Sequence, residues 1–162
     1  MILLELERTS FRLLNSADKE ALFEIYSDKD AMQYRTTAPF ETQDEIDTYL
    51  EQVEQENLSG QKFRCAFVHT ETNQLMGTAV YALLDATSAE IGFSIGRAFW
   101  KGGYGTEGTW GLIELIKQRE PQIQRIVGIA QTANEKSVRM MERMNFTFVK
   151  EEGNKSYFEY LL

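Results

Sequence analysis

One segment restricts the architecture of this chain more than any other: a strand-like run leads through closely spaced glycines directly into a helical pattern. The run ends near Ile95, and the helix extends from about Gly103 to Arg119. Gly102, Gly103 and Gly105 stand where the helix must begin. Glycine at such a place lets consecutive backbone N–H groups point at one spot. Because a helix N-terminus also carries roughly half a positive charge, the segment predicts a cradle for a phosphate or pyrophosphate.

Two common nucleotide-binding motifs do not fit this segment. It has no Gly-Lys-Ser/Thr ending, which excludes a nucleotide P-loop, and the dinucleotide fingerprint G-x-G-x-x-G is not satisfied in the right register. A glycine-rich turn that only starts a helix is the alternative interpretation of the same residues. The residues alone leave both interpretations open.

The rest of the chain alternates between strand-like and helix-like hydrophobic patterns. Asn15 or Ser16 can cap a first helix that begins near residue 17. Thr42 and Glu45 predict a capping box for a second helix, which ends before Gly60. The remaining expected elements are an irregular segment over 28–40, helices over 103–119 and 135–144, and strands over 6–14, 62–69, 75–84, 89–95, 125–131, 146–150 and 156–161. This order predicts an α/β chain, with a mixed sheet on which helices pack.

Length and composition point to a single folded domain over residues 1–162. The chain is 43% apolar and 26% charged, which is ordinary for a globular protein. No apolar run approaches the ~18 residues of a membrane helix, so we expect no membrane association. Charges at Glu5, Glu7 and Arg8 interrupt the first apolar stretch, so it has no signal-peptide core. A cytoplasmic location is the default expectation.

The net charge, and the presence of only one cysteine and one histidine, argue against several classes of function. Asp and Glu number 25 against 17 Lys and Arg, for a net charge of −8, which makes nucleic acid a poor partner and a cationic substrate a better one. The single cysteine, Cys65, permits no internal disulfide, and with a single histidine, His69, a zinc site built on Cys and His is excluded. On one strand these two residues would lie about 13 Å apart, too far for a catalytic dyad. We expect no metal.

Two blocks of sequence resemble a known family. Trp100-Lys-Gly-Gly-Tyr-Gly resembles the Q/R-x-x-G-x-G/A acetyl-CoA loop of the GNAT N-acetyltransferases. Tryptophan at its first position, with Gly-Tyr-Gly-Thr-Glu after it, is similar to the RimJ/RimL-type branch, which acetylates ribosomal-protein N-termini and includes relatives that act on small amines. The second block, Asn134 to Phe146, resembles the family's N-x-x-S/A-x-x-x-x-E-K-x-G-F helix. The likeness covers nearly the whole chain. It implies the GNAT fold, a mixed, mostly antiparallel central sheet of about seven strands, splayed at its centre, with flanking helices.

The resemblance implies acetyl-CoA as the co-substrate. Backbone N–H groups of residues 101–106 would hold the pyrophosphate, and pantetheine would lie between the fourth and fifth strands. Gly92 and Gly128 lie in those strands, where glycine often marks a close backbone approach. Lys136 belongs to a local group of basic residues that suits a ligand of about four negative charges, although solvated helix charge is the alternative. The expected cofactor-binding residues are Phe93, Ser94, Ile95, Lys101, Gly102, Gly103, Tyr104, Gly105, Thr106, Asn134 and Lys136.

For catalysis, the resemblance implies direct attack of an amine on the thioester. Glu90 is the best candidate for the base, directly or through a water, and a solvent-facing strand carboxylate is the alternative. The family's usual tyrosine, the acid for the leaving thiolate, falls on Met141, whose thioether has no proton to give. Ser137 matches a serine of the RimL-like branch, and we expect it to be the proton donor.

The acceptor is the least defined part of the expected site. By analogy with the family, the wall residues of its pocket are Tyr34, Arg35, Phe40 and Tyr157. The branch favours a protein or peptide N-terminal amine. A polyamine or aminoglycoside-like amine is the alternative acceptor, and a non-catalytic acyl-CoA-binding module is the alternative function. Because dimers are common among relatives, a homodimer is one expected assembly.

Overall fold

The computed structural model describes residues 1–35 and 38–162, and the eight strands of this part form one sheet. Their order across the sheet is β1-β2-β3-β4-β5-β6-β8-β7. All neighbouring pairs are antiparallel except β5 and β6, which are parallel. The strands are β1 (Ile2–Glu5), β2 (Thr9–Arg12), β3 (Lys62–His69), β4 (Leu75–Leu83), β5 (Ser88–Ile95), β6 (Arg125–Gln131), β7 (Thr147–Glu152) and β8 (Lys155–Leu161). The mixed, mostly antiparallel sheet confirms the expected fold class.

Four α-helices lie on this sheet within the described residues. They are α1 (Lys19–Ser27), α2 (Asp44–Ser59), α3 (Tyr104–Arg119) and α4 (Glu135–Arg143). None of the helices in the described ranges is long and apolar enough to cross a membrane. The bounds agree with the expected helices to within about two residues.

The N-terminal strand differs from the expectation. Of the run 6–14, only Thr9–Arg12 forms a strand, β2. A further strand, β1, precedes the run and pairs antiparallel with β2, with Glu5 opposite Ser10. A turn closed by the Leu6 N–H, which donates to the Thr9 carbonyl at 2.8 Å, joins them. This hairpin adds an eighth strand to the sheet. Neither glycine nor proline marks the turn in the sequence, so the apolar pattern gave no sign of it.

The start of α2 also differs from the expectation. Gln43 is the N-cap residue and makes no side-chain cap bond, so the predicted Thr42 capping box is wrong. The Glu45 carboxylate instead accepts a hydrogen bond from the Glu41 N–H at 3.3 Å. The other end of the helix is as predicted, since Gly60 follows it with a left-handed φ of 75°.

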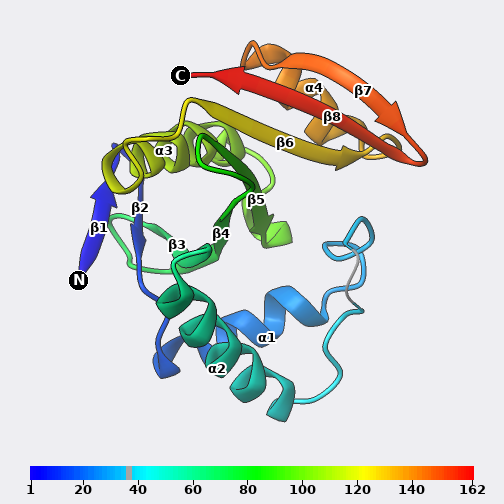
Figure 1. Cartoon of the computed structure of the whole chain (residues 1–162). Helices are drawn as coiled ribbons and strands as arrows, with labels where there is room; N and C mark the ends of the chain where they lie inside the picture. Colours follow the sequence, from blue (N-terminus) through cyan, green and yellow to red (C-terminus); the bar gives the residue numbers. More distant parts are fainter. Residues whose placement is uncertain (36–37) are drawn as a thin grey trace.

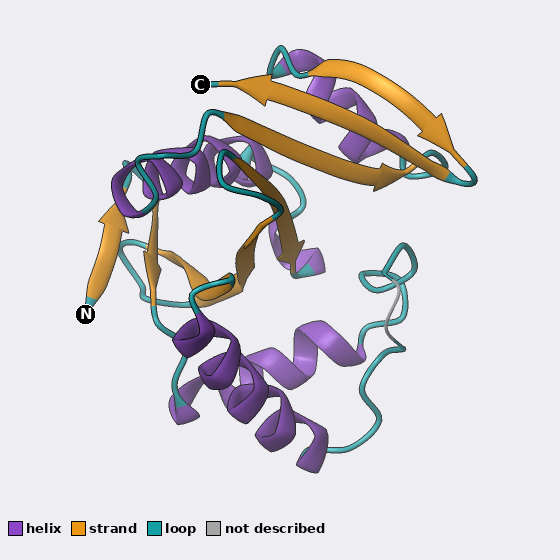
Figure 2. Cartoon of the chain, in the orientation of Figure 1, coloured by secondary structure: helices purple, strands orange, loops and turns teal. Residues whose placement is uncertain are grey.

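The two faces of the sheet carry two separate cores. Along β3, Phe63, Cys65 and Phe67 pack with side chains of α3, whereas Ala66 and Val68 pack with α1 and α2. This alternation follows from the two-residue period of a strand. Figure 2 shows α1 and α2 together, away from α3 and from α4, which lies beside β6 and β7. The part of the α1/α2 face that β5, β6 and β8 form carries no helix among the described residues.

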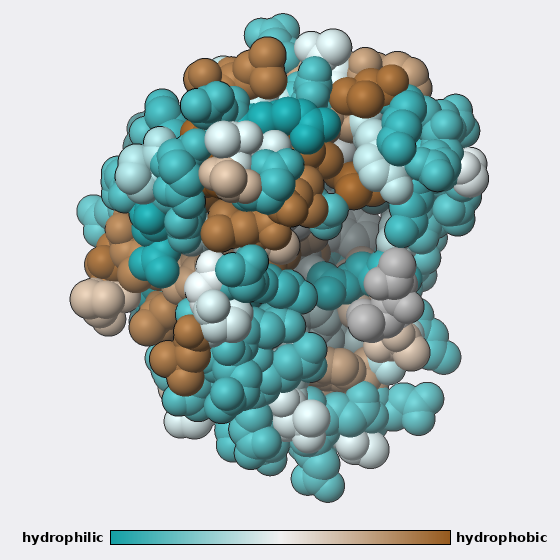
Figure 3. Space-filling view, viewed as in Figure 1, coloured by the Kyte–Doolittle hydropathy of each residue, from teal (hydrophilic) through white to brown (hydrophobic). Residues whose placement is uncertain are grey.

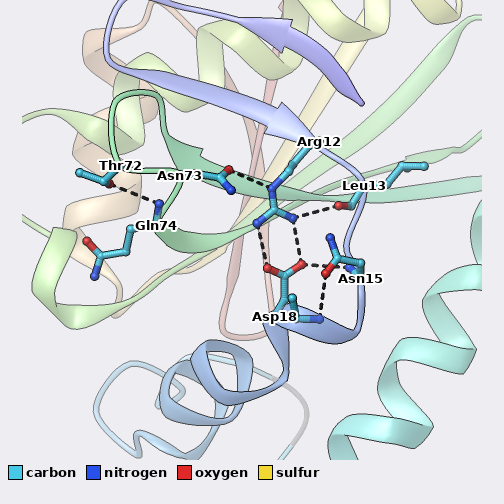
Figure 4. A network of polar contacts seen from close by, with 8 residues as sticks. Arg12, Leu13, Asn15, Asp18, Thr72, Asn73 and Gln74 are labelled. Carbon is cyan, nitrogen blue, oxygen red and sulfur yellow. Dashed lines mark hydrogen bonds and ion pairs between the residues drawn. The ribbon is translucent and has the colours of Figure 1, made fainter.

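A partly buried ion pair fixes the start of α1 to the sheet. The Arg12 guanidinium makes two hydrogen bonds to the Asp18 carboxylate, at 2.9 and 2.8 Å, and a third to Asn73 in the β3–β4 turn (Figure 4). Asn15 caps the turn in front of α1 by accepting from the Ala17 N–H, as one of the two sequence candidates predicted. Strand β2, helix α1 and the β3–β4 turn are thereby held together.

The sheet opens between β5 and β6. Their parallel pairing stops at Ile91 and Gly128. Beyond that point β5 stays paired with β4 as far as Ile95, and β6 stays paired with β8 as far as Gln131. Figure 1 shows the two strands diverging, with β6, β8 and β7 leaving the plane of β3 to β5. One backbone edge of β5, over 92–95, therefore has no partner strand among residues 1–35 and 38–162.

Candidate functional site

The loop between β5 and α3 has the geometry of an anion cradle. Gly102 and Gly103 adopt φ values of 101° and 80°, which L side chains rarely adopt, so this backbone requires glycine. The backbone N–H groups from Lys101 to Thr106 find no acceptor among the described residues. The first N–H of α3 to do so is that of Glu107, which donates to the Gly103 carbonyl. Unpaired N–H groups and the helix N-terminus together favour a bound phosphate.

Arg8, in the turn between β1 and β2, braces this loop from outside. Its guanidinium donates to the Gly102 carbonyl at 2.8 Å and to the Glu107 carboxylate at 2.9 Å. It also lies 4.5 Å from the centre of the Tyr104 ring. The sequence analysis missed this role, because nothing local to Arg8 indicates a partner nearly a hundred residues away.

Glu107 is the acidic member of this brace. Its second carboxylate oxygen accepts a hydrogen bond of 2.5 Å from the Thr9 hydroxyl. Partial burial would raise the pKa of Glu107, but the hydrogen bonds from Thr9 and Arg8, with the positive charge of Arg8, hold that pKa below its ordinary value. The carboxylate therefore stays ionised and holds the first turn of α3 against β2.

Arg97 and Lys136, two basic residues near the loop, differ in the partners of their charged groups. Arg97 is bonded to both Asp28 and Asp30, so its charge is largely compensated. The Lys136 ammonium lies 5.1 Å from the centre of the Trp100 ring, beside the loop. Trp100 itself donates from Nε1 to the Ile95 carbonyl at 2.9 Å, which fastens the loop to the end of β5. Lys136 is therefore better placed than Arg97 to meet an anionic ligand.

At the opening between β5 and β6, glycine allows helix α4 to lie close to the sheet. A Cβ at Gly128 would come within 2.6 Å of the Met141 sulfur. Met141 is buried in the core beneath β6, so no protic side chain stands where the family's usual tyrosine is expected. Ser137, half-buried, lies one helical turn earlier, and its N–H donates to Asn134 Oδ1 at 3.4 Å. Asn134 thus caps α4, and its side-chain NH₂ group makes no hydrogen bond to another described residue.

A cavity of about 300 Å³ opens on the helix-free part of the α1/α2 face. Among the residues proposed from the sequence, Glu90, Phe93, Ser94, Tyr34 and Arg35 line it. It therefore brings the expected base and half of the expected acceptor wall together beside the opening between β5 and β6. Thr36 and Thr37, next to Arg35, lie outside the described residues.

Phe40 and Tyr157, the other two expected wall residues, do not line this cavity. Phe40 packs against the rings of Tyr26 and Tyr49, with centroids 5.5 and 5.9 Å away, and so belongs to the second core. Tyr157 lies beneath the Lys150 ammonium, 4.9 Å from its ring centre. The acidic residues of α2 do not line the cavity either. They belong to the mostly hydrophilic surface that Figure 3 shows over the region of α2.

Arg64 is a lining residue that the sequence analysis missed. Arg64 lies in the middle of β3 and is only 8% exposed to solvent. A charged residue between Phe63 and Cys65, inside an apolar strand, was the available signal, because fully buried arginines are rare unless paired. The other lining residues are Val80, Gly92, Ile129, Gln131 and Lys155.

Comparisons with known proteins agree with this arrangement. Residues 8–147 match the family model described as acetyltransferase (GNAT) domain. A curated relative, the uncharacterized N-acetyltransferase p20 of Bacillus licheniformis, is 25% identical over 142 residues, which cover 86% of this chain and 79% of the relative. Both matches include the glycine loop and the start of α4.

Solved structures share the fold. A GNAT-family acetyltransferase from Bacillus anthracis aligns with a TM-score of 0.81 at 23% identity, covering 99% of this chain and 98% of that one. RimL, a ribosomal L7/L12 alpha-N-protein acetyltransferase in complex with coenzyme A, aligns at 0.85 with 16% identity over 100% and 98%. Spermidine N-acetyltransferase from Vibrio cholerae, with CoA and spermine, aligns at 0.80 with 16% identity over 95% of each chain. Together with the family match, these findings identify the chain as a member of the GNAT family of acetyl-CoA-dependent N-acetyltransferases.

Proposed function

We propose that this enzyme acetylates the α-amine of a peptide or protein N-terminus, in the manner of the RimL-like branch. The observation that carries the proposal is the cavity at the unpaired edge of β5, which is lined by three cationic side chains and one carboxylate. A polyamine would bring several positive charges to these cations, whereas an N-terminal amine brings one. Residues 1–162 act as one catalytic domain in this proposal, because both cores pack on the same sheet.

The glycine loop fits the negatively charged end of acetyl-CoA. We assign the pyrophosphate to the N–H groups of Lys101, Gly102, Gly103, Tyr104, Gly105 and Thr106, with Lys136 and Asn134 beside them. The free N–H groups and the two left-handed glycines support this assignment. Bound there, the substrate extends its pantetheine arm toward the gap between β5 and β6, along Phe93, Ser94 and Ile95.

In the reaction, acetyl-CoA supplies a thioester whose acetyl carbon bonds to the amine nitrogen as the carbon–sulfur bond breaks. Backbone N–H groups on the open edge of β5 stabilise the oxyanion. Glu90 takes one proton of the ammonium, directly or through a water. As the carbon–sulfur bond breaks, the Ser137 hydroxyl gives a proton to the departing sulfur and regains one from the nitrogen, so the products are a neutral amide and the CoA thiol. An α-amine suits a single carboxylate base, since neutralising it at pH 7 costs about 1.4 kcal/mol, against about 4.6 kcal/mol for a lysine amine.

A panel of acceptors tests this proposal. Thiol release from acetyl-CoA is measured with N-terminal peptides, lysine peptides with blocked N-termini, polyamines and aminoglycosides. Release with the free N-termini, at least tenfold faster than with the other amines, is the expected result. Turnover confined to polyamines or aminoglycosides would move the enzyme to the small-amine class. Binding of acetyl-CoA without release to any amine would favour the non-catalytic alternative.

A further inference from the structure

The acceptor cavity is cationic in a strongly acidic protein. The described residues that line it include Arg35, Arg64 and Lys155 against one carboxylate, Glu90, for a local charge of 3 − 1 = +2, whereas the whole chain carries −8. None of these four groups takes part in an ion pair with another described residue. The cavity therefore holds cations that remain available to a ligand.

Among these cations, Arg64 gives the clearest indication of a negatively charged ligand. It is buried, and its Nε–H has no hydrogen-bond partner among the described residues. One terminal nitrogen donates to the Thr78 hydroxyl at 3.4 Å. No carboxylate of the described residues forms an ion pair with Arg64, although the charge of Glu56 acts on it, and burying a guanidinium carries a desolvation cost. A negatively charged ligand in the cavity would supply the missing partner.

The rings of Tyr49 and Tyr26 lie beside the two arginines, and the Glu56 carboxylate, which is paired with Lys62, acts on Arg64 from farther away. The Arg64 and Arg35 guanidinium carbons lie 5.8 Å from the Tyr49 ring centre and 5.1 Å from the Tyr26 ring centre. The Tyr26 hydroxyl is hydrogen-bonded to the Thr78 hydroxyl, at 2.6 Å, and to that of Tyr49, at 3.0 Å. Burial would raise the pKa of Tyr26, but the positive charges of Arg64 and Arg35, with these hydrogen bonds, hold that pKa below its ordinary value. The field in this corner is therefore positive.

The register of the strands places Arg64 close to the reacting centre. Arg64 pairs with Val80 on β4, and Val80 pairs with Gly92 on β5. Gly92 is the first residue of β5 beyond the point where pairing with β6 stops. At about 4.8 Å per strand, the Arg64 backbone lies roughly 10 Å from that opening, within the reach of an arginine side chain and a small acceptor. Arg35 approaches the same edge, because its guanidinium donates to the Ser94 hydroxyl.

We propose that the acceptor carries a carboxylate within a few bonds of its amine, and that Arg64, with Arg35 beside it, binds that carboxylate. The proposal rests on the proposed function and narrows its substrate class. A planar guanidinium suits a carboxylate because the two can form paired hydrogen bonds. The carboxylate comes from an acidic side chain in the first two residues of a peptide or from a free amino acid. The cavity of about 300 Å³, near the lower end of small-molecule sites, admits either.

Matched acceptors test the substrate class. Thiol release is measured with the amidated peptides Ser-Asp-Ala-Ala and Ser-Asn-Ala-Ala, which differ by one charge, and with free aspartate. We expect kcat/KM for the aspartate peptide to exceed that for the asparagine peptide by about tenfold or more, as for a hydrogen bond to a charged group. Turnover of free aspartate above that of the peptide would assign the carboxylate to a free amino acid. Equal rates with the two peptides, and none with free aspartate, would overturn the proposal.

Variants then assign the preference to Arg64. Arg64→Gln should lower kcat/KM for the aspartate peptide about tenfold more than it lowers kcat/KM for the asparagine peptide, and Arg64→Lys should retain part of the preference. Arg125→Gln is the matched control, because it removes one positive charge from β6 at a residue paired with Glu159 outside the cavity. Because Arg64 lacks a carboxylate partner, Arg64→Gln should melt no lower than the parent. A preference that survives in Arg64→Gln would contradict the assignment.

A binding experiment separates this proposal from the function on which it rests. Succinate is titrated calorimetrically into the parent protein and Arg64→Gln. Binding to the parent that the substitution weakens about tenfold supports the anion site even if no amine in either panel is acetylated, in which case the proposed function fails alone. If amines are acetylated but succinate does not bind and acidic acceptors are not preferred, the function stands and the carboxylate proposal falls.

Discussion

Ser137 shows how much of the chemistry depends on single side chains. The buried Met141 lies where the family's usual tyrosine is expected, and Ser137 precedes it by one turn of α4. A thioether cannot protonate a departing thiolate, but a hydroxyl can. The half-buried Ser137, at the start of α4, is therefore the proton donor that we assign.

Replacing this hydroxyl should affect turnover more than binding. Ser137→Ala is expected to lower kcat about 100-fold, within the range for general acid catalysis, and to change the Kd of acetyl-CoA less than about twofold. Steady-state kinetics and calorimetric titration measure the two effects. Ser137→Thr keeps a hydroxyl and serves as the control. An unchanged kcat in the alanine variant would show that another group protonates the sulfur.

Gly103 tests the anion cradle through charge. Its φ of 80° strains any L side chain, so Gly103→Gln and Gly103→Glu share the same backbone penalty and differ by one negative charge. We expect the glutamine variant to bind acetyl-CoA weakly and the glutamate variant to show no measurable binding by calorimetry. Equal affinity in the two variants would remove the argument that this loop holds the pyrophosphate.

At the scale of elements, the start of α3 depends on contacts from the β1–β2 hairpin. Glu107 joins the two through Thr9 and Arg8, and its pKa is lower in the folded protein than in the unfolded chain. A carboxylate with a lowered folded pKa contributes stability above its unfolded pKa, near 4.5, and loses it as pH falls through the folded value. The brace is therefore present at neutral pH and is lost in acid.

Glu107→Gln should reveal this dependence. The variant is expected to unfold with about 1 kcal/mol less free energy than the parent at pH 7, since Arg8 is largely exposed and its ion pair is screened. The difference should shrink as pH falls below about 4.5. Urea unfolding at pH 7 and in steps down to pH 3.5 measures it. A difference independent of pH would show that the carboxylate charge is not what stabilises the folded state.

Local sequence signals predicted most helices and strands, because hydrophobic periodicity and glycine stops depend on residues that are neighbours in the sequence. Strand β6 and the glycine stop of α2 lie where the patterns placed them. The β1–β2 hairpin was missed because its turn uses ordinary residues, and the Thr42 cap failed because Glu45 bonds to Glu41 instead. Local patterns do not encode which distant residues a side chain will meet.

The residues of the candidate site also fall into two groups, those that local sequence determines and those that distant contacts determine. The glycine loop was predictable, because backbone geometry at glycine is a local property. The roles of Arg8 and Arg64 were not, since each depends on partners brought close only by the folded sheet. Phe40, predicted as a wall residue, packs against the second core instead of lining the cavity, because its ring meets those of Tyr26 and Tyr49.

At the scale of the whole molecule, the charge of the cavity is opposite to the net charge of the chain. The chain is acidic as a whole, and the acidic residues of α2 do not line the acceptor cavity. The cavity beside the gap between β5 and β6 is cationic, and the N–H groups of the loop after β5 are free to bind an anion. Net charge alone favoured a cationic substrate, whereas the local arrangement favours an acceptor with a single amine and a negative group.

The measurement that tests the central claim most directly follows CoA release and the acetylated product in one reaction. The protein is incubated with acetyl-CoA and an N-terminal peptide, and mass spectrometry of fragment ions locates the new acetyl group. The account predicts one acetyl group on the α-amine for each CoA released, and loss of both signals in Gly103→Glu. CoA release without an acetylated amine, or acetylation that persists in Gly103→Glu, would contradict it.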